Sequence, residues 1–160
     1  MDKLLQILSE NSDFTTEELA SMLGEPEDYI CAQIKEYRAQ GIIKGYHATI
    51  NWEKVKNSNV TALIELKVTP KPESGFEEMA QRVMEYSEVR SVYLMAGAYD
   101  LALFVQGESI QDVSAFVSRK LSALDGIIST ATHFVLKCYK ESGVNLVDSE
   151  DDNDKRSLIL

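Results

Sequence analysis

The chain has 160 residues, of which 44% are hydrophobic and 26% charged, a composition typical of globular proteins built from one domain or two small ones. No apolar run approaches the roughly 20 residues of a membrane span, and the N-terminus lacks the apolar stretch of a signal peptide, so we expect a cytoplasmic protein. The formal net charge of −10 disfavours binding to phosphates, because such binding draws much of its free energy from cations.

The two cysteines and two histidines of the chain are scattered along it: Cys31, His47, His133 and Cys138. Their spacing matches no metal-ligand motif, so we expect no metal site and no cofactor. The sequence also lacks a glycine-rich phosphate loop, a nucleophile elbow and a paired acid–base constellation. These observations argue against an enzyme.

Two short helices are predicted at the N-terminus. Residues 3–9 have the spacing of an amphipathic helix. After a polar break, Thr15 and Glu18 have the spacing of a capping box, so a second helix is expected to start there. Gly24 then occupies the place of a left-handed residue that ends this helix.

A third helix is expected over Glu27–Ala39, because Pro26 favours its first turn and Gly41 favours its end. The residues that follow, 42–50, have the pattern of a small β-wing. Three short helices, with a tight turn between the last two, are what a helix-turn-helix requires. Residues 1–50 are therefore predicted to form a winged helix-turn-helix domain.

Beyond a polar linker at residues 51–59 the pattern alternates as strand, helix, strand, strand, helix, strand. The expected elements are a strand over 60–68, a helix over about 74–86, two strands of a hairpin within 92–107, a helix from about Ser109 and a strand from Ile127 to about Tyr139. Right-handed crossovers then place both helices on one face of a four-stranded antiparallel sheet. Residues 60–140 are therefore predicted to form a ferredoxin-like βαββαβ domain.

The predicted fold class is α+β, with one sheet face left without helices. Leu63, Tyr93 and Phe104 would form an apolar patch on that face, too large for a monomer, so we expect two copies to dimerise sheet to sheet. Residues 141–160 are acidic and are expected to form a solvated, flexible tail. A sharper alternative is that the tail docks on a partner or competes with DNA for a basic surface.

Several short stretches, taken in this order and spacing, resemble the Lrp/AsnC family, also called feast/famine regulatory proteins. The matching stretches are Leu19-Ala20, Gly41 to Tyr46, Gly97-Ala98-Tyr99-Asp100-Leu101 and Gly126 to Thr132. Together they extend over nearly the whole chain up to about residue 140. The resemblance implies a transcription regulator that forms homodimers, often octamers, and binds an amino acid or related metabolite between subunits.

The resemblance places the effector by the central hairpin turn and the last strand. It nominates six residues, Gly97, Tyr99, Asp100, Leu101, Thr130 and Thr132. A carboxylate such as Asp100 can hold an ammonium group, while exposed backbone N–H groups and threonine hydroxyls can hold a carboxylate. Plain structural roles also stay open: Gly97 can make the turn with a positive φ, Asp100 can cap it, and Tyr99 can pack across a dimer.

The resemblance also implies double-stranded DNA as a partner, contacted by Gln33, Lys35, Arg38 and Lys44. The third helix is however preceded by the acidic stretch Glu25-Pro26-Glu27-Asp28, which phosphates would repel, and the N-terminal domain carries nine acidic and only four basic residues. Two functions therefore stay open. One is a DNA-binding transcriptional regulator that responds to an amino acid, and the other is a non-DNA-binding sensor or adaptor that acts through protein partners.

Overall fold

The computed structural model describes residues 2–56, 59–71 and 75–147. The backbone falls into two compact units. One unit contains the chain up to Ile50 together with the described residues from Tyr139 onward, and the other contains Asn51–Cys138. The predicted acidic tail lies almost entirely outside the described residues. Each unit is described by itself below.

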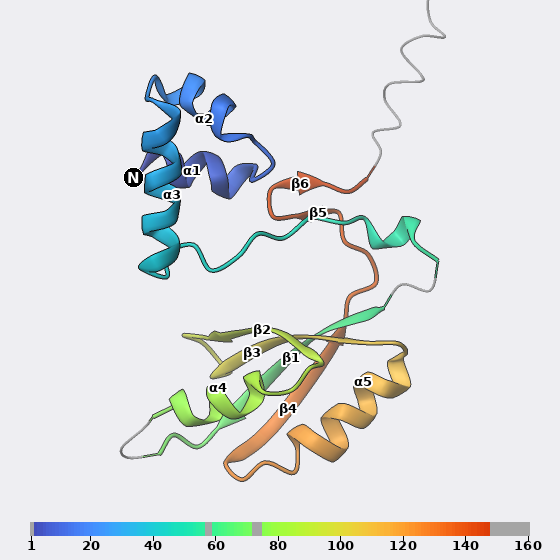
Figure 1. The fold of residues 1–160 in the computed structure, drawn as a ribbon. Coiled ribbons are helices and arrows are strands. Elements are labelled where there is room, and N and C mark those ends of the chain that lie inside the picture. Colours follow the sequence, from blue (N-terminus) through green and yellow to red (C-terminus); the bar gives the residue numbers. More distant parts are fainter. Residues whose placement is uncertain (1, 57–58, 72–74, 148–160) are drawn as a thin grey trace, which may run out of the picture. The chain divides into compact units, whose positions relative to one another are not determined.

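The first unit begins with two short helices, α1 (Lys3–Glu10) and α2 (Thr16–Leu23) (Figure 1). The predicted capping box of α2 is confirmed: the Glu18 N–H donates to the Thr15 hydroxyl at 3.2 Å, and the Thr15 N–H donates to the Glu18 carboxylate at 2.8 Å. Gly24 ends α2 with a φ of 70°, in the left-handed region that glycine adopts without steric cost.

The third helix, α3, covers Glu27–Ala39 as predicted. Leu4, Leu19 and Ile30, one from each helix, form the buried centre of the first unit. The Tyr37 hydroxyl of α3 also donates to the Asp2 carboxylate at the start of α1, at 2.5 Å. This bond raises the pKa of Tyr37 to about 12, since ionisation would remove the donor proton. The three helices are therefore joined by both apolar and polar contacts.

The predicted β-wing is wrong, because residues 43–50 belong to no helix or strand. The prediction that α3 ends at Gly41 is confirmed, since Gly41 has a φ of 70°. Only the predicted wing after Gly41 is wrong. A lone ribbon of nine residues has too few paired groups and too little apolar cover to be stable. The only short hairpin among the described residues of this unit lies elsewhere, between β5 (Lys140–Glu141) and β6 (Val144–Asn145). The predicted linker contains one short helical turn, η1 (Trp52–Lys54).

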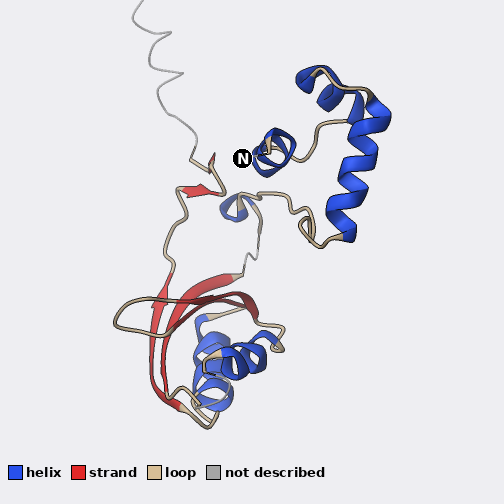
Figure 2. Ribbon diagram, turned by 90° about the vertical axis from the view of Figure 1, so that its left-hand side faces the viewer, coloured by secondary structure: helices blue, strands red, loops and turns tan. Residues whose placement is uncertain are grey.

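The second unit contains one four-stranded sheet and one helical layer. Its elements are β1 (Val60–Val68), α4 (Glu77–Met84), β2 (Val89–Leu94), β3 (Leu101–Gly107), α5 (Ile110–Phe116) with the π-helical turn η2 (Val117–Leu121), and β4 (Ile127–Phe134). The strands lie antiparallel in the order β2-β3-β1-β4. Both helices cover the same face of the sheet (Figure 2). The ferredoxin-like prediction is confirmed, although β4 ends earlier than expected.

Buried and more exposed side chains alternate along β1, and the buried ones form the core of the second unit. On β1 the side chains of Ala62, Ile64, Leu66 and Val68 are buried under the helices, and Leu101, Leu103 and Val105 of β3 join them. The alternate residues point to the other face, where Phe104 is 37% exposed and Tyr93 52% exposed.

None of the helices in the described part of the chain has both the length and the apolar character that a membrane-spanning helix needs.

Candidate nucleic-acid interface and ligand site

The turn between α2 and α3 is fixed by hydrogen bonds at its two ends. The N–H groups of Gly24 and Glu25 both donate to the carbonyl of Ala20, at 2.9 and 3.1 Å, which closes α2 and reverses the chain. The Thr16 hydroxyl of α2 donates to the Glu27 carboxylate of α3 at 2.5 Å. The first turn of α3 is therefore tied to α2, and the sequence of helix, short turn and helix is that of a helix-turn-helix.

One face of α3 is exposed along its whole length. Asp28, Ala32, Lys35 and Ala39 follow one another at intervals of four, three and four residues, so they form one stripe on the helix. Gln33 lies two residues from Lys35, which is about 200° around the helix. Its half-buried side chain lines a hollow of about 260 Å³ with residues of α1. The structure therefore does not bring Gln33 to the face that carries Lys35.

The other predicted DNA contacts gather at the C-terminal end of α3. The guanidinium of Arg38 lies over the ring of Tyr46, 5.3 Å from its centroid, and is held there by a cation–π interaction. The Lys44 Nζ lies only 2.8 Å from the point where a side chain on Gly41 would begin. Lys44 therefore folds back over the end of α3, where helix carbonyls favour a cation.

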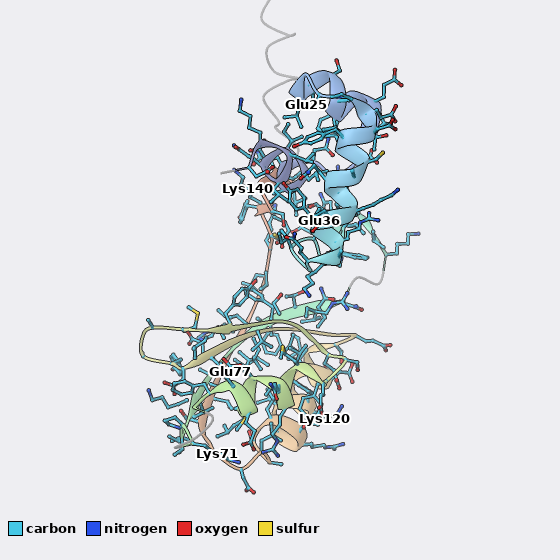
Figure 3. All side chains as sticks on the ribbon, turned by 60° about the vertical axis from the view of Figure 1, so that its left-hand side comes forward. Glu25, Glu36, Lys71, Glu77, Lys120 and Lys140 are labelled. Atoms are coloured by element: carbon cyan, nitrogen blue, oxygen red, sulfur yellow. The ribbon has the colours of Figure 1, made fainter. Side chains whose placement is uncertain are left out.

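Acidic side chains surround the same helix, but two of them are engaged within the domain. Glu27 accepts from Thr16, and Glu36 accepts from the Gln40 side chain at 2.5 Å. Figure 3 shows Glu25 where α3 begins and Glu36 further along it. Glu25, Glu27 and Asp28 therefore lie at or just before the start of the helix, whereas Lys35, Arg38 and Lys44 lie in and after its second half, together with Glu36.

The predicted effector loop, residues 95–100, joins β2 to β3. Its last residue, Asp100, is bonded to the neighbouring strand β1: one carboxylate oxygen accepts from the Val68 N–H at 2.9 Å, and the other lies 3.3 Å from the Lys67 Nζ. The Asp100 N–H also donates to the Leu66 carbonyl at 2.9 Å. The Val68 N–H above all, aided by Lys67, lowers the pKa of Asp100. Asp100 therefore fastens the loop to β1.

The other residues of this loop differ in how far a ligand could reach them. Gly97 is exposed, and a Cβ built on it would meet no described atom within 4 Å. Its φ lies outside the left-handed region, so the open alternative that Gly97 makes the turn with a positive φ does not hold. Tyr99 is half-buried, whereas the side chain of Leu101 is 1% exposed and belongs to the core. Leu101 can therefore offer a ligand only its backbone.

Thr130 and Thr132 lie on the opposite face of the sheet from Asp100. They pair with Leu66 and Ile64, whose side chains point into the helical layer. Residues directly opposite each other in a ladder share a face. The structure therefore does not bring these threonines together with Asp100 within one chain, so a site that uses both must draw them from two copies.

A polar cluster that was not predicted lies on the helical side of the second unit. The Lys120 Nζ of η2 is 2.5 Å from the Glu88 carboxylate and lies over the rings of Tyr86 and Phe116, at 5.5 and 5.6 Å from their centroids. Lys120 is labelled in Figure 3. Lys120 lowers the pKa of Glu88. The sequence offers no signal for this cluster, because Lys120 and Glu88 are 32 residues apart in the chain.

Comparison with known proteins agrees with both units. The family model described as the Lrp/AsnC ligand binding domain matches residues 61–144. YugG of Bacillus subtilis, an uncharacterised HTH-type transcriptional regulator, is 45% identical over 158 residues, which covers 98% of this chain and 94% of the relative. The proline dehydrogenase transcriptional activator of Rhizobium radiobacter is 28% identical over 142 residues, 89% of this chain and 90% of the relative.

Solved structures have the same fold. The transcriptional regulator NMB0573 of Neisseria meningitidis, in complex with L-methionine, matches with a TM-score of 0.69 and 27% identity over 87% of this chain and 89% of that one. E. coli AsnC matches with a TM-score of 0.65 and 23% identity over 88% and 95% of the two chains. The chain therefore belongs to the Lrp/AsnC family of helix-turn-helix transcriptional regulators, which is a family of regulators and not of enzymes.

Proposed function

We propose that this chain is a cytoplasmic, DNA-binding transcriptional regulator whose DNA binding responds to an amino acid. The observation that carries the proposal is the pairing, in one chain, of a capped α2–turn–α3 module with an Lrp/AsnC ligand binding domain. The methionine complex of NMB0573, 27% identical to this chain, supports an amino acid as the class of effector.

DNA contact is assigned to the cations in and after the second half of α3. Lys35 is exposed on the outward stripe, and Arg38 and Lys44 lie at the C-terminal end of the helix. Lys3 adds a fourth cation from α1. Each cation that meets a phosphate releases counterions, so the affinity should fall as salt rises. Gln33 is left out of this assignment, because it faces α1.

The effector site is assigned to the space between two copies of the chain. One copy would offer the exposed Gly97 and the half-buried Tyr99. Thr130 and Thr132 face the helical layer, so they would join this site only across a second contact, between the hairpin turn of one dimer and the helical side of another. Asp100 would act by holding the loop in place, because its carboxylate is already occupied by Val68 and Lys67. This division follows from the opposite sheet faces on which Asp100 and the threonines lie.

Two measurements test the function. DNA fragments from the source genome would be bound at about 50 and 200 mM salt, with and without single amino acids. A regulator should bind more weakly at the higher salt and should change its affinity with at least one amino acid. Gly97→Val is the matched variant for the effector step: its side chain would enter open space in the free chain, so it should keep DNA binding and lose the amino-acid response.

One observation favours the alternative of a sensor or adaptor that binds proteins and not DNA. The turn before α3 and its first residues carry Glu25, Glu27 and Asp28, and the N-terminal unit is acidic overall. If the pure protein binds no DNA at about 50 mM salt while it still binds an amino acid, the DNA-binding proposal fails and the adaptor takes its place.

A homodimer, or an octamer built from dimers, is the proposed assembly. The sheet face without helices carries Leu63, Phe104 and Tyr93, and the last two rings pack edge to face at 6.3 Å. Polar pairs flank these rings: His133 lies 3.1 Å from Glu65, and Lys67 lies beside Asp100. An apolar centre with a polar rim is the pattern of an interface between proteins.

A further inference from the structure

The outward stripe of α3 carries a carboxylate where a DNA reader usually carries a neutral or basic group. This inference rests on the proposed function, because it concerns what the helix reads once it is in the groove. We infer that Asp28 reads a cytosine in each half-site and that Lys35 reads a guanine about three base pairs away. The acid in the first turn of the helix would thus help to determine which DNA sequence the protein binds.

Geometry selects Asp28 among the acids near the start of α3. Glu27 is bonded to Thr16 of α2 and so is directed back into the domain. Glu25 lies in the turn before the helix. Asp28 is exposed, lies on the outward stripe with Ala32 and Lys35, and forms no side-chain hydrogen bond or ion pair with any other described residue. It is therefore the acid that would face the bases, since the first turns of a recognition helix contact the base edges.

The chemistry of a carboxylate then selects the base. An ionised carboxylate only accepts hydrogen bonds. In the major groove guanine presents two acceptors and thymine presents one with a methyl group, so both would repel or exclude it. Adenine presents a donor beside an acceptor, whereas cytosine presents the N4 amino donor alone. Cytosine is therefore the base that best pairs with Asp28.

Helix dimensions then place the second base. Lys35 lies seven residues after Asp28 on the same stripe, which is about 10 Å along the helix axis. Base pairs are stacked about 3.4 Å apart, so this distance corresponds to about three base pairs when the helix follows the groove. A lysine ammonium donates to the O6 and N7 acceptors of guanine. Ala32, between the two, presents only a methyl group and leaves room for a thymine methyl.

The test is an in vitro selection from random double-stranded DNA with the full chain and two variants that each remove one negative charge from α3. In Asp28→Asn the amide can both donate and accept, so the selected base should change from cytosine to adenine. In Glu36→Gln, a control on the same helix but off the stripe, the selected site should stay the same. Both variants should bind DNA more tightly overall, because each removes a repulsion from phosphates.

The wild-type protein should prefer cytosine at one position of each half-site by about 5- to 10-fold. A selected site in which no position changes between wild type and Asp28→Asn would overturn the inference while leaving the proposed function intact. Failure of the folded wild-type protein to select any DNA would instead overturn the proposed function, and the inference with it. The circular dichroism spectra of both variants should match that of the wild type, which checks that no helix has been lost.

Discussion

The carboxylate of Asp100 fastens the end of the central hairpin to β1 through the Val68 N–H and the ammonium of Lys67. We expect Asp100→Asn to unfold at a lower temperature than the wild type at pH 7, because an amide keeps an acceptor but loses the charge that strengthens both contacts. Asp125→Asn, at an exposed aspartate in the turn before β4, is the matched control and should leave the melting temperature unchanged.

The difference in melting temperature between the wild type and Asp100→Asn should depend on pH. The pKa of Asp100 is lowered in the folded chain, so near its ordinary value, about 4, the unfolded chain binds more protons than the folded one. The stability that the carboxylate adds is therefore complete above that pH and is lost as acidification protonates the folded state. Melting curves should show the gap between wild type and Asp100→Asn shrinking below about pH 4. A gap of constant size down to pH 2 would contradict this role.

Lys120 is the second residue for which the contacts predict a measurable effect. Its ammonium pairs with Glu88 and lies over two aromatic rings. We expect Lys120→Met to lower the free energy of unfolding by about 1 kcal/mol, the usual size of a partly exposed ion pair with cation–π support. Arg119→Met is the control, because Arg119 is exposed and forms no ion pair in the described part of the chain. Equal losses in the two variants, measured by urea unfolding, would refute the prediction.

At the scale of the element, the capping box decides where α2 begins. Thr15→Ala removes the hydroxyl that accepts from the Glu18 N–H, and we expect it to cost about 1 kcal/mol of folding free energy. Ser21→Ala, at an exposed position inside α2, replaces a hydroxyl residue by alanine without touching a cap and should be neutral or slightly stabilising. Chemical unfolding followed by circular dichroism measures the free energy of unfolding of both variants. If Thr15→Ala loses no more stability than Ser21→Ala, the cap does not stabilise the protein.

The helices could be predicted from the sequence because their signals are local. The bounds of α3, the capping box at Thr15 and the ends at Gly24 and Gly41 all depend on residues within a few positions of each other. A wing depends instead on pairing with another strand, about which the residues 42–50 carry no information. That prediction therefore failed where the interaction was no longer local.

The residues of the candidate sites could likewise be placed from the sequence only where local spacing decides their position. The sequence alone shows which residues share a side of α3, because helical spacing puts Gln33 and Lys35 on different sides of the helix. The face on which Thr130 and Thr132 lie was not available, since it depends on how β4 pairs with β1. The ladder shifts by one residue between Lys67 and Val68, and such a shift exchanges the two faces of a strand. The partners of Asp100 also come from β1, about thirty residues earlier in the chain.

At the scale of the whole molecule, the sheet face without helices should set the assembly. We expect Phe104→Asp to place a charge in the centre of the proposed interface and to convert a dimer, or a larger assembly, into a monomer of 17.9 kDa. Ile110→Asp is the control: Ile110 is 50% exposed and begins α5 on the other side of the sheet. It carries the same substitution and should keep the wild-type mass in light scattering.

Loss of the dimer should also change how DNA binding depends on salt. A single helix-turn-helix offers the four cations Lys3, Lys35, Arg38 and Lys44, so two linked copies can neutralise about twice as many phosphates as one. The slope of log affinity against log salt should therefore fall by about half in Phe104→Asp, while the affinity itself falls by more, because two joined sites bind as one. A monomeric Phe104→Asp with the wild-type slope would show that each DNA site is bound by one copy. The sheet face would then have no part in DNA binding.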